Sequence, residues 1–255
     1  MPVDEAARAR TLARFEQLQR AWDANPALQT LTADWYGRVA AALPPPSLGR
    51  RVELGSGPGL ARGYIPDLEL TDIVKAQWHE REVRAEALPY ADGSLGALVL
   101  FDVLHHVPQP RQFFVEAQRV LVPGGRVIMC EPFIGPLSFL VYNFFHDEPV
   151  DLLADPLEPA AGHDERDPFD SNQAIPTTLF ANPSGRAAFA REFPSFEVLR
   201  LERLAGLSYV ASGGTSHAPF LPFALWRALH AFEARWPEPV FRLFGFRMLV
   251  TLERR

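Results

Sequence analysis

A short predicted strand that runs directly into a glycine-rich turn is the feature that most restricts the fold of this chain. The strand is expected over Arg51–Leu54, and Gly55, Gly57 and Gly59 then follow at alternate positions. Glycine allows the backbone to turn sharply and to approach a ligand closely. A dinucleotide-binding turn has the pattern Gly-x-Gly-x-x-Gly, but Leu60 stands where its last glycine belongs. The spacing therefore disfavours a nicotinamide-dependent enzyme.

Strands and helices alternate along the rest of the chain. Further strands are expected at Leu68–Asp72, Val83–Ala85, Ala97–Phe101, Arg126–Cys130, Phe196–Leu204 and Met248–Leu252. A helix that carries Phe113, Ala117, Val120 and Leu121 on one side precedes the stop signal Pro123-Gly124-Gly125. This alternation predicts an α/β fold with a doubly wound, mostly parallel, seven-stranded Rossmann-like sheet.

Segments outside this alternation predict additions to the sheet. Amphipathic helices are expected over residues 4–24 and around Trp35, and the second of them stops at Pro44. Residues 1–46 are therefore expected to form an N-terminal helical cap on a domain of residues 47–255. Within that domain, residues from about 136 to 185 include an irregular polar stretch and are expected to form an inserted lid. Near the end, a helix is expected over residues 222–236, and most of the dense aromatic residues between 220 and 246 are expected to be core.

Composition removes several classes of protein. The net charge of −6 argues against a nucleic-acid partner, and the single Cys130 permits no internal disulfide. The first residues lack a signal-peptide pattern. The uncharged stretch from Pro132 to Phe145 is shorter than the ~20 residues that span a bilayer. We therefore expect a soluble, cytoplasmic protein whose oligomeric state the sequence leaves open.

Two acids mark the carboxyl ends of the first two strands. Glu53 precedes the glycine turn and favours a cationic ligand, whereas Asp72 ends the second strand. An acid in the latter position can accept hydrogen bonds from both hydroxyls of a ribose. Together with the glycines, these acids predict a ligand site at this edge of the sheet.

Four segments in this order resemble the class I S-adenosylmethionine (SAM)-dependent methyltransferase family, in particular its small-molecule branch, the type 11-like methyltransferases. The segments are Glu53–Gly59, Ala85–Ser94, Phe101–His106 and Arg119–Gly125. The resemblance covers roughly the central third of the chain. It implies SAM as the cofactor and predicts cofactor contacts at Glu53, Gly55, Ser56, Gly57, Gly59, Asp72, Ala85, Glu86, Asp102 and Val103. The chain departs from the family at Arg84, because an acid that accepts from adenine commonly stands there.

Methyl transfer to a hydroxyl benefits from a base, and three residues are candidates for catalysis. They are His106 after the fourth strand, Glu131 after the fifth, and His146 at the start of the polar stretch. His105 and His106 are neighbours whose side chains are expected to diverge, so no metal site is predicted. Each candidate also has a structural interpretation, as a strand end, a solvated acid or a helix cap.

Polar side chains of the predicted lid are candidates for binding the acceptor. They are Glu148, Asp170, Asn172 and Gln173, which alternatively form surface ion pairs and a turn. They suit a hydroxyl-rich acceptor, whereas the aromatic residues near the end of the chain suit an apolar one. A face that rests on a membrane is a less favoured interpretation of the same aromatic residues.

Taken together, these patterns predict an enzyme that transfers a methyl group from SAM to a small-molecule acceptor, with oxygen favoured as the acceptor atom. The alternative is a catalytically inactive, methyltransferase-like binding or regulatory protein. Arg84 and the short segment between the glycine turn and Pro66 motivate that alternative. Fold supports many substrates in such proteins, so the acceptor stays open.

Overall fold

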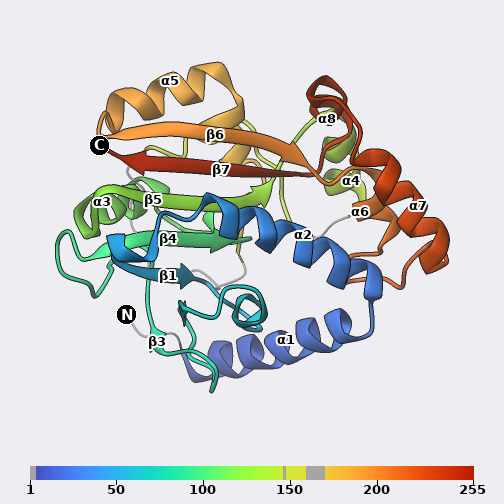
Figure 1. Ribbon diagram of the computed structural model, residues 1–255, viewed down its shortest axis with the longest axis horizontal. Coiled ribbons are helices and arrows are strands. Elements are labelled where there is room, and N and C mark those ends of the chain that lie inside the picture. The colour runs from blue at the N-terminus through green and yellow to red at the C-terminus, as the bar shows by residue number, and fades with distance from the viewer. Residues whose placement is uncertain (1–3, 146–147, 159–169) are drawn as a thin grey trace.

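The computed structural model describes residues 4–145, 148–158 and 170–255 of the chain. A seven-stranded sheet with the order β3-β2-β1-β4-β5-β7-β6 forms its centre. The strands are β1 Arg50–Leu54, β2 Leu68–Asp72, β3 Arg81–Glu82, β4 Leu95–Phe101, β5 Leu121–Pro132, β6 Phe196–Leu204 and β7 Arg247–Arg254. The helices are α1 Glu5–Asp23, α2 Pro26–Ala42, α3 Pro110–Val120, α4 Pro136–Phe145, α5 Pro183–Glu192, α6 Leu207–Ala211, α7 Phe223–Glu233 and α8 Glu238–Phe244. Figure 1 shows these helices around the sheet.

The first five strands of this order are parallel, and β7 runs antiparallel between β5 and β6. This arrangement confirms the predicted α/β class with a mostly parallel sheet of seven strands. The chain passes from β1 to β2 and β3 on one side of β1, and it then returns to β4 on the other side of β1. The carboxyl end of β1 therefore lies at a topological switch point, where open α/β sheets bind ligands.

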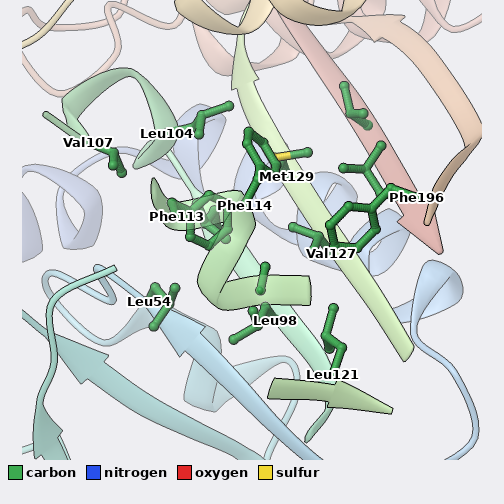
Figure 2. Close-up of a cluster of buried hydrophobic side chains, with 14 of the residues drawn as sticks. Leu54, Leu98, Leu104, Val107, Phe113, Phe114, Leu121, Val127, Met129 and Phe196 are labelled. Carbon is green, nitrogen blue, oxygen red and sulfur yellow. The ribbon is translucent and has the colours of Figure 1, made fainter. Parts of the chain in front are cut away.

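Two layers of apolar side chains cover the faces of the sheet. On one face Phe113 and Phe114 of α3 pack against Leu98 and Met129, and all four are fully buried (Figure 2). On the other face Trp35 of α2 joins the cluster that contains the alternate strand residues of β4 and β5. Strands that are buried on both faces explain the continuous apolar runs that made β4 and β5 recognisable in the sequence.

Several boundaries differ from their predictions. The third strand is Arg81–Glu82 rather than Val83–Ala85, because this two-residue edge strand pairs only with the end of β2. The helix α3 ends at Val120, before the predicted Pro-Gly-Gly stop, because Leu121 already pairs with Leu95 in the sheet. Between β1 and β2 the chain forms only a short 3-10 turn, η2 (Leu60–Gly63), as the nearby Pro66 indicated.

Part of the predicted lid is regular. The apolar α4 opens it, and a π-helical turn, η4 (Thr177–Ala181), lies near its end. Between them, residues 148–158 and 170–174 have no helix or strand. Among the described residues, no helix is both long and apolar enough to cross a membrane.

The aromatic residues near the end of the chain are not mostly core, so that prediction is wrong. Trp226 and Phe246 are fully buried, but Phe220, Leu225 and Phe232 are 59–64% exposed. The predicted helix over 222–236 also stops at Glu233, and Pro237 precedes a separate helix, α8. Both helices therefore leave apolar side chains exposed to solvent, among them Leu225 and Phe232 of α7 and Leu243 of α8.

Candidate active site

A single cavity of about 770 Å³ opens at the carboxyl edge of the sheet. Its walls come from α1 and α2, from the glycine turn after β1, from the segments after β2 and β4, and from the start of β7. Tyr142 of α4, Glu148 and Gln173, all from the predicted lid, line it as well. The volume lies within the range of small-molecule sites.

The glycine turn requires the absence of side chains. Gly55 has φ +63°, and a Cβ atom on it would lie 2.5 Å from Cγ2 of Val103. Its backbone therefore forms the floor of the cavity directly beside the segment that follows β4. The turn is anchored from below, because Nε1 of Trp78 donates a hydrogen bond of 2.8 Å to the carbonyl of Gly57.

Asp72 holds the far side of the same turn. Its carboxylate accepts a 2.9 Å hydrogen bond from the amide of Gly57 and a 3.1 Å hydrogen bond from the amide of Val74. Burial raises the pKa of Asp72 to about 6 although these two amides lower it. Each carboxylate oxygen has two acceptor positions, so Asp72 retains acceptor capacity toward the cavity that it lines.

Glu53 lies behind the turn and does not line the cavity. It is 1% exposed, and the hydroxyl of Tyr36 donates a 2.9 Å hydrogen bond to it. Burial raises its pKa to about 7. Tyr36 itself is stacked between the rings of Tyr64 and Phe101 and reaches the cavity wall. Glu53 is therefore linked to the cavity wall through Tyr36, and its predicted contact with a ligand stays a prediction.

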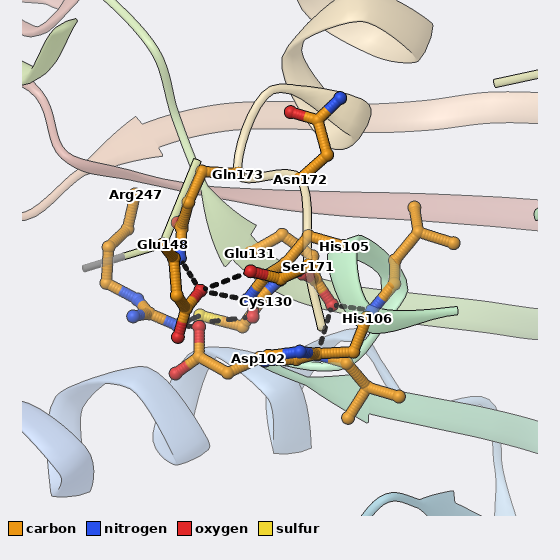
Figure 3. Close-up of polar contacts among 12 residues, drawn as sticks. Asp102, His105, His106, Cys130, Glu131, Glu148, Ser171, Asn172, Gln173 and Arg247 are labelled. Atoms are coloured by element: carbon orange, nitrogen blue, oxygen red, sulfur yellow. Dashed lines mark hydrogen bonds and ion pairs between the residues drawn. The ribbon is translucent and has the colours of Figure 1, made fainter. Parts of the chain in front are cut away.

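His105 lies between two carboxylates at the opposite side of the cavity (Figure 3). Its Nδ1 lies 2.7 Å from Oε2 of Glu131, and its Nε2 lies 3.6 Å from Oε2 of Glu148. The second carboxylate oxygen of Glu131 accepts hydrogen bonds from the amides of Val103 and Leu104. Glu131 thus fixes both the turn after β4 and the orientation of the His105 ring.

The two neighbouring histidines have opposite electrostatics. Burial lowers the pKa of His105, but its hydrogen bonds to Glu131 and Glu148 outweigh burial and raise it to about 9. Burial and then the charge of His105 lower the pKa of His106 to about 4. At neutral pH His105 is therefore protonated, whereas His106 is neutral.

The neutral His106 has a defined tautomer. Its Nδ1 lies 3.3 Å from the carbonyl of Asp170, which can only accept a hydrogen bond. The proton therefore belongs on Nδ1, and Nε2 is the basic nitrogen. The rings of His105 and His106 lie 4.2 Å apart, so the expected divergence of these side chains is wrong. The reason is that both residues belong to a 3-10 turn, η3 (Leu104–His106), rather than to a strand.

The same side chains have the spacing of a metal site. Among the described residues, ligand atoms of His105, His106 and Glu148 all lie within 4.8 Å of one another. A protonated His105, however, has no lone pair for a metal. Protonation of His105 and binding of a metal ion by His105 therefore exclude one another, and the raised pKa of His105 favours protonation.

Asp102 and Arg247 form a further polar element of the cavity. Asp102 has φ +58°, which is uncommon for a residue with a side chain, and it forms a 2.5 Å ion pair with Arg247. The guanidinium of Arg247 is buried over the rings of Trp35 and Phe101, at 4.6 and 5.2 Å. Arg247, the first residue of β7, thus links the turn after β4 to Trp35 of α2.

The structure brings most of the predicted site residues together. The predicted residues that line the cavity are Gly55, Ser56, Gly57, Asp72, Ala85, Glu86, Asp102, Val103, His106, Glu148 and Gln173. Gly59 faces Trp78 instead. Glu131 does not reach the cavity, because its carboxylate is fully occupied beneath the β4 turn. His146 lies outside the described residues.

The remaining polar residues of the predicted lid contact the histidines and Glu148 rather than the cavity. Asp170 contributes its carbonyl to His106, and the amide of Asn172 donates a 2.9 Å hydrogen bond to the carbonyl of His105. Ser171 donates a hydrogen bond to the carboxylate of Glu148, as does Gln173. The lid segment around residue 171 is therefore joined directly to η3 and to Glu148.

Several cavity residues were not predicted. Thr11 and Phe15 of α1, Tyr142 of α4 and Tyr209 line it, as does Arg247. Only Arg247 had a signal in the sequence, because it is a charge within the apolar run Phe246–Val250. The others are ordinary members of amphipathic helices, which a sequence cannot distinguish from core residues.

Comparisons with known proteins agree with this geometry. Residues 52–129 match the family model described as a methyltransferase domain. A demethylmenaquinone methyltransferase of Clavibacter sepedonicus is 29% identical over 47% of this chain and 56% of its own length. An uncharacterized methyltransferase of Mycobacterium tuberculosis is 33% identical over 47% of this chain and 55% of its own length. The chain thus spans little more than half the length of these two curated relatives.

A solved structure extends the likeness to the whole fold. A SAM-dependent methyltransferase of Thermotoga maritima superposes with a TM-score of 0.54 at 18% identity, over 98% of this chain and 99% of its own. At this identity the superposition concerns the fold alone. The matched residues 52–129 contain the glycine turn, Asp72 and both histidines. Residues 52–129 therefore match a methyltransferase domain, which confirms the resemblance to class I SAM-dependent methyltransferases that the four sequence segments predicted.

Proposed function

We propose that this protein transfers a methyl group from SAM to an oxygen atom of a small-molecule acceptor. One observation carries the proposal: a single cavity joins the glycine turn and Asp72 to the polar cluster around His106. A methyl transfer requires two sites that meet inside one water-excluding space, because donor and acceptor atoms must be aligned. The helix α1, which lines the same cavity, supplies such a cover.

The residues on the glycine side suit the cofactor. The backbone of Gly55 and Gly57 offers close approach, and Asp72 offers acceptor capacity to the ribose hydroxyls. Ala85 and Glu86 line the wall where the adenine would lie. Arg84 lines it too and can only donate, so its guanidinium would serve a ring nitrogen rather than the adenine amino group. The bound cofactor would supply an activated methyl group on a sulfonium.

The acceptor would lie on the histidine side. We assign Nε2 of His106 the role of removing the hydroxyl proton, because this imidazole is neutral at physiological pH. A base whose pKa is lowered to about 4 takes a proton readily only from an acidic hydroxyl. We therefore favour a phenol- or enol-type oxygen over that of an aliphatic alcohol.

Polar groups beside His106 would orient such an acceptor. Glu148 lines the cavity, and so does Gln173, whose Oε1 is buried and has no hydrogen-bond partner among the described residues. A buried amide oxygen of this kind is stabilised by a donor from a ligand. Glu131 and His105 act as positioning residues, since they hold the β4 turn and the ring next to His106.

Isothermal titration with S-adenosylhomocysteine tests the cofactor half of the proposal. We expect micromolar binding to the wild type and a loss of about 10- to 100-fold in affinity for Asp72→Ala, because charge-assisted hydrogen bonds are removed. Asp92→Ala is the matched control, since this aspartate is 80% exposed and outside the cavity. Unmeasurable binding to the wild type at millimolar ligand would refute the cofactor assignment.

A second assay tests turnover. SAM with a radiolabelled methyl group would be incubated with a panel of phenols, enols, aliphatic alcohols and sugars, and the organic and aqueous products counted. Transfer to a phenol or enol that disappears in His106→Gln, with cofactor affinity unchanged, is the expected result. Tight cofactor binding without transfer to any member of the panel would instead favour the catalytically inactive, methyltransferase-like protein.

A further inference from the structure

Three neighbouring helices expose large apolar side chains to solvent. This apolar face consists of Phe139, Leu140 and Phe144 of α4, Leu225 and Phe232 of α7, and Leu243 and Phe244 of α8, each 38–73% exposed. Scattered exposed apolar residues are normal on a protein surface, but a contiguous group marks an interaction site.

The apolar face is contiguous. The helix α4 packs against α8, and the ring of Trp236 connects α8 to α7, at 5.9 Å from Phe244 and 6.1 Å from Phe232. Figure 1 shows the three helices gathered at one end of the molecule, beyond the ends of the strands. Leu225 and Phe232 are separated by two helical turns, so they project from the same side of α7.

On α7, on α8 and in the link between them, the exposed charges are mostly positive, although the chain as a whole has a net charge of −6. Arg227, Arg235 and Arg242 are exposed. Arg227 and Arg235 form no ion pair with any residue that the structure describes. The two acids of α7 and α8 are neutralised or hidden, because Glu238 is paired with Arg242 and Arg203 and Glu233 is 3% exposed.

We propose that the apolar face docks on the surface of an anionic lipid bilayer. Short helices with aromatic and leucine side chains beside arginines lie in the membrane interface, where the apolar side chains enter the acyl boundary and the arginines meet anionic headgroups. A second copy of the chain is disfavoured, because a symmetric contact would place like-charged arginines opposite one another. This inference is independent of the proposed methyl transfer.

Docking in this way would bring the cavity close to the membrane. The helix α4 has two sides: Tyr142 is buried and lines the cavity, whereas Phe144 is 73% exposed. One helix therefore separates the cavity from the proposed lipid contact. An acceptor that partitions into the bilayer would have a short path to the histidine side of the cavity.

Flotation on a sucrose gradient tests the inference with vesicles of phosphatidylcholine mixed with phosphatidylglycerol. We expect the wild type to float at low salt. The variant Phe144→Ser/Leu243→Ser should bind about tenfold or more weakly, because two apolar side chains no longer enter the interface. Leu199→Ser is the matched control, since Leu199 is 44% exposed on β6, outside the apolar face, and should float like the wild type.

A charge variant separates the electrostatic part. Arg227→Glu/Arg235→Glu should lose binding to the mixed vesicles, and all variants should keep the wild-type circular dichroism and melting temperature. A wild type that stays at the bottom of the gradient would overturn the proposal, and so would a serine variant that floats unchanged. A wild-type dimer in size-exclusion chromatography that the serine variant dissociates, without flotation, would assign the face to self-association instead.

Discussion

The charged pair of His105 and Glu131 makes a quantitative prediction about the pH dependence of stability. His105 is buried and has a folded-state pKa of about 9, against about 6.5 for a histidine in an unfolded chain. The folded state therefore binds this proton more tightly than the unfolded state. The corresponding stabilisation is fully present below the unfolded pKa and is lost as the pH rises through the folded pKa.

The magnitude follows from the two pKa values. A difference of about 2.5 pKa units corresponds to about 3 kcal/mol of unfolding free energy when the pH is below 6. By linkage, about 2 kcal/mol of it remains at pH 7.5, and almost none remains at pH 10. We therefore expect His105 alone to lower the unfolding free energy by about 2 kcal/mol between pH 7.5 and 10.

Urea unfolding at both pH values measures this decline. The variant His105→Gln/Glu131→Gln replaces the charged pair with two neutral amides, so its decline should be smaller than that of the wild type by about 2 kcal/mol. Replacing Glu131 together with His105 avoids leaving a buried carboxylate whose own titration would imitate that of the histidine. His217→Gln, at an exposed position, is the matched control and should follow the wild type.

Equal losses of unfolding free energy in the wild type and the double variant between pH 7.5 and 10 would refute the assignment of this proton to His105. An NMR titration of the wild type gives a second reading that does not depend on the stability of the variant. The imidazole carbon resonance of His105 should titrate near pH 9. A midpoint near 6.5 would show that the two carboxylates do not hold the proton.

Three further predictions concern the cofactor side and the core. Gly55→Ala should weaken binding of S-adenosylhomocysteine and lower the unfolding free energy by about 1–2 kcal/mol, because the backbone is left-handed there and the new side chain would collide with Val103. Gly63 has open space around it, so Gly63→Ala should leave the affinity measured by calorimetry unchanged. Affinity for S-adenosylhomocysteine should fall as the pH drops through about 6, where Asp72 becomes protonated, and Asp72→Asn should abolish this dependence in the same titration. In urea unfolding, Trp226→Ala should lower the unfolding free energy by about 3–5 kcal/mol and Phe232→Ala by less than about 1 kcal/mol, because only the Trp226 side chain is fully buried. Similar losses for the two variants would contradict the exposed position of Phe232 on α7.

The sheet could be predicted closely because its signals are local. The bounds of β2 and β6 agree with the sequence patterns, and β4 and β5 were recognised from their continuous apolar runs. The edge strand β3 was misplaced, since two exposed residues have no pattern that a sequence can show. The glycine turn was recognisable as well, because Gly55, Gly57 and Gly59 all have a positive φ, which is a local backbone requirement that favours glycine.

The histidine side of the cavity was less accessible to prediction. Glu131 looked like a residue that faces an acceptor, but it holds the amides of Val103 and Leu104, which are more than 25 positions earlier in the chain. Arg247 meets Asp102 across an even longer separation. Pairings of this kind depend on which strands lie side by side. The topology therefore had to be known before the role of either charge could be assigned.

The aromatic helices near the end of the chain show a different limit of sequence reasoning. Apolar residues at helical spacing identify one side of a helix, and that side is usually assigned to the core. In α7, however, Trp226 points inward while Leu225 and Phe232 point outward, so apolar residues occupy both sides. Apolar residues on both sides of a surface helix indicate that one side meets a partner rather than the core. An anionic bilayer is the partner that we propose, and the arginines beside α7 are placed as such a partner requires.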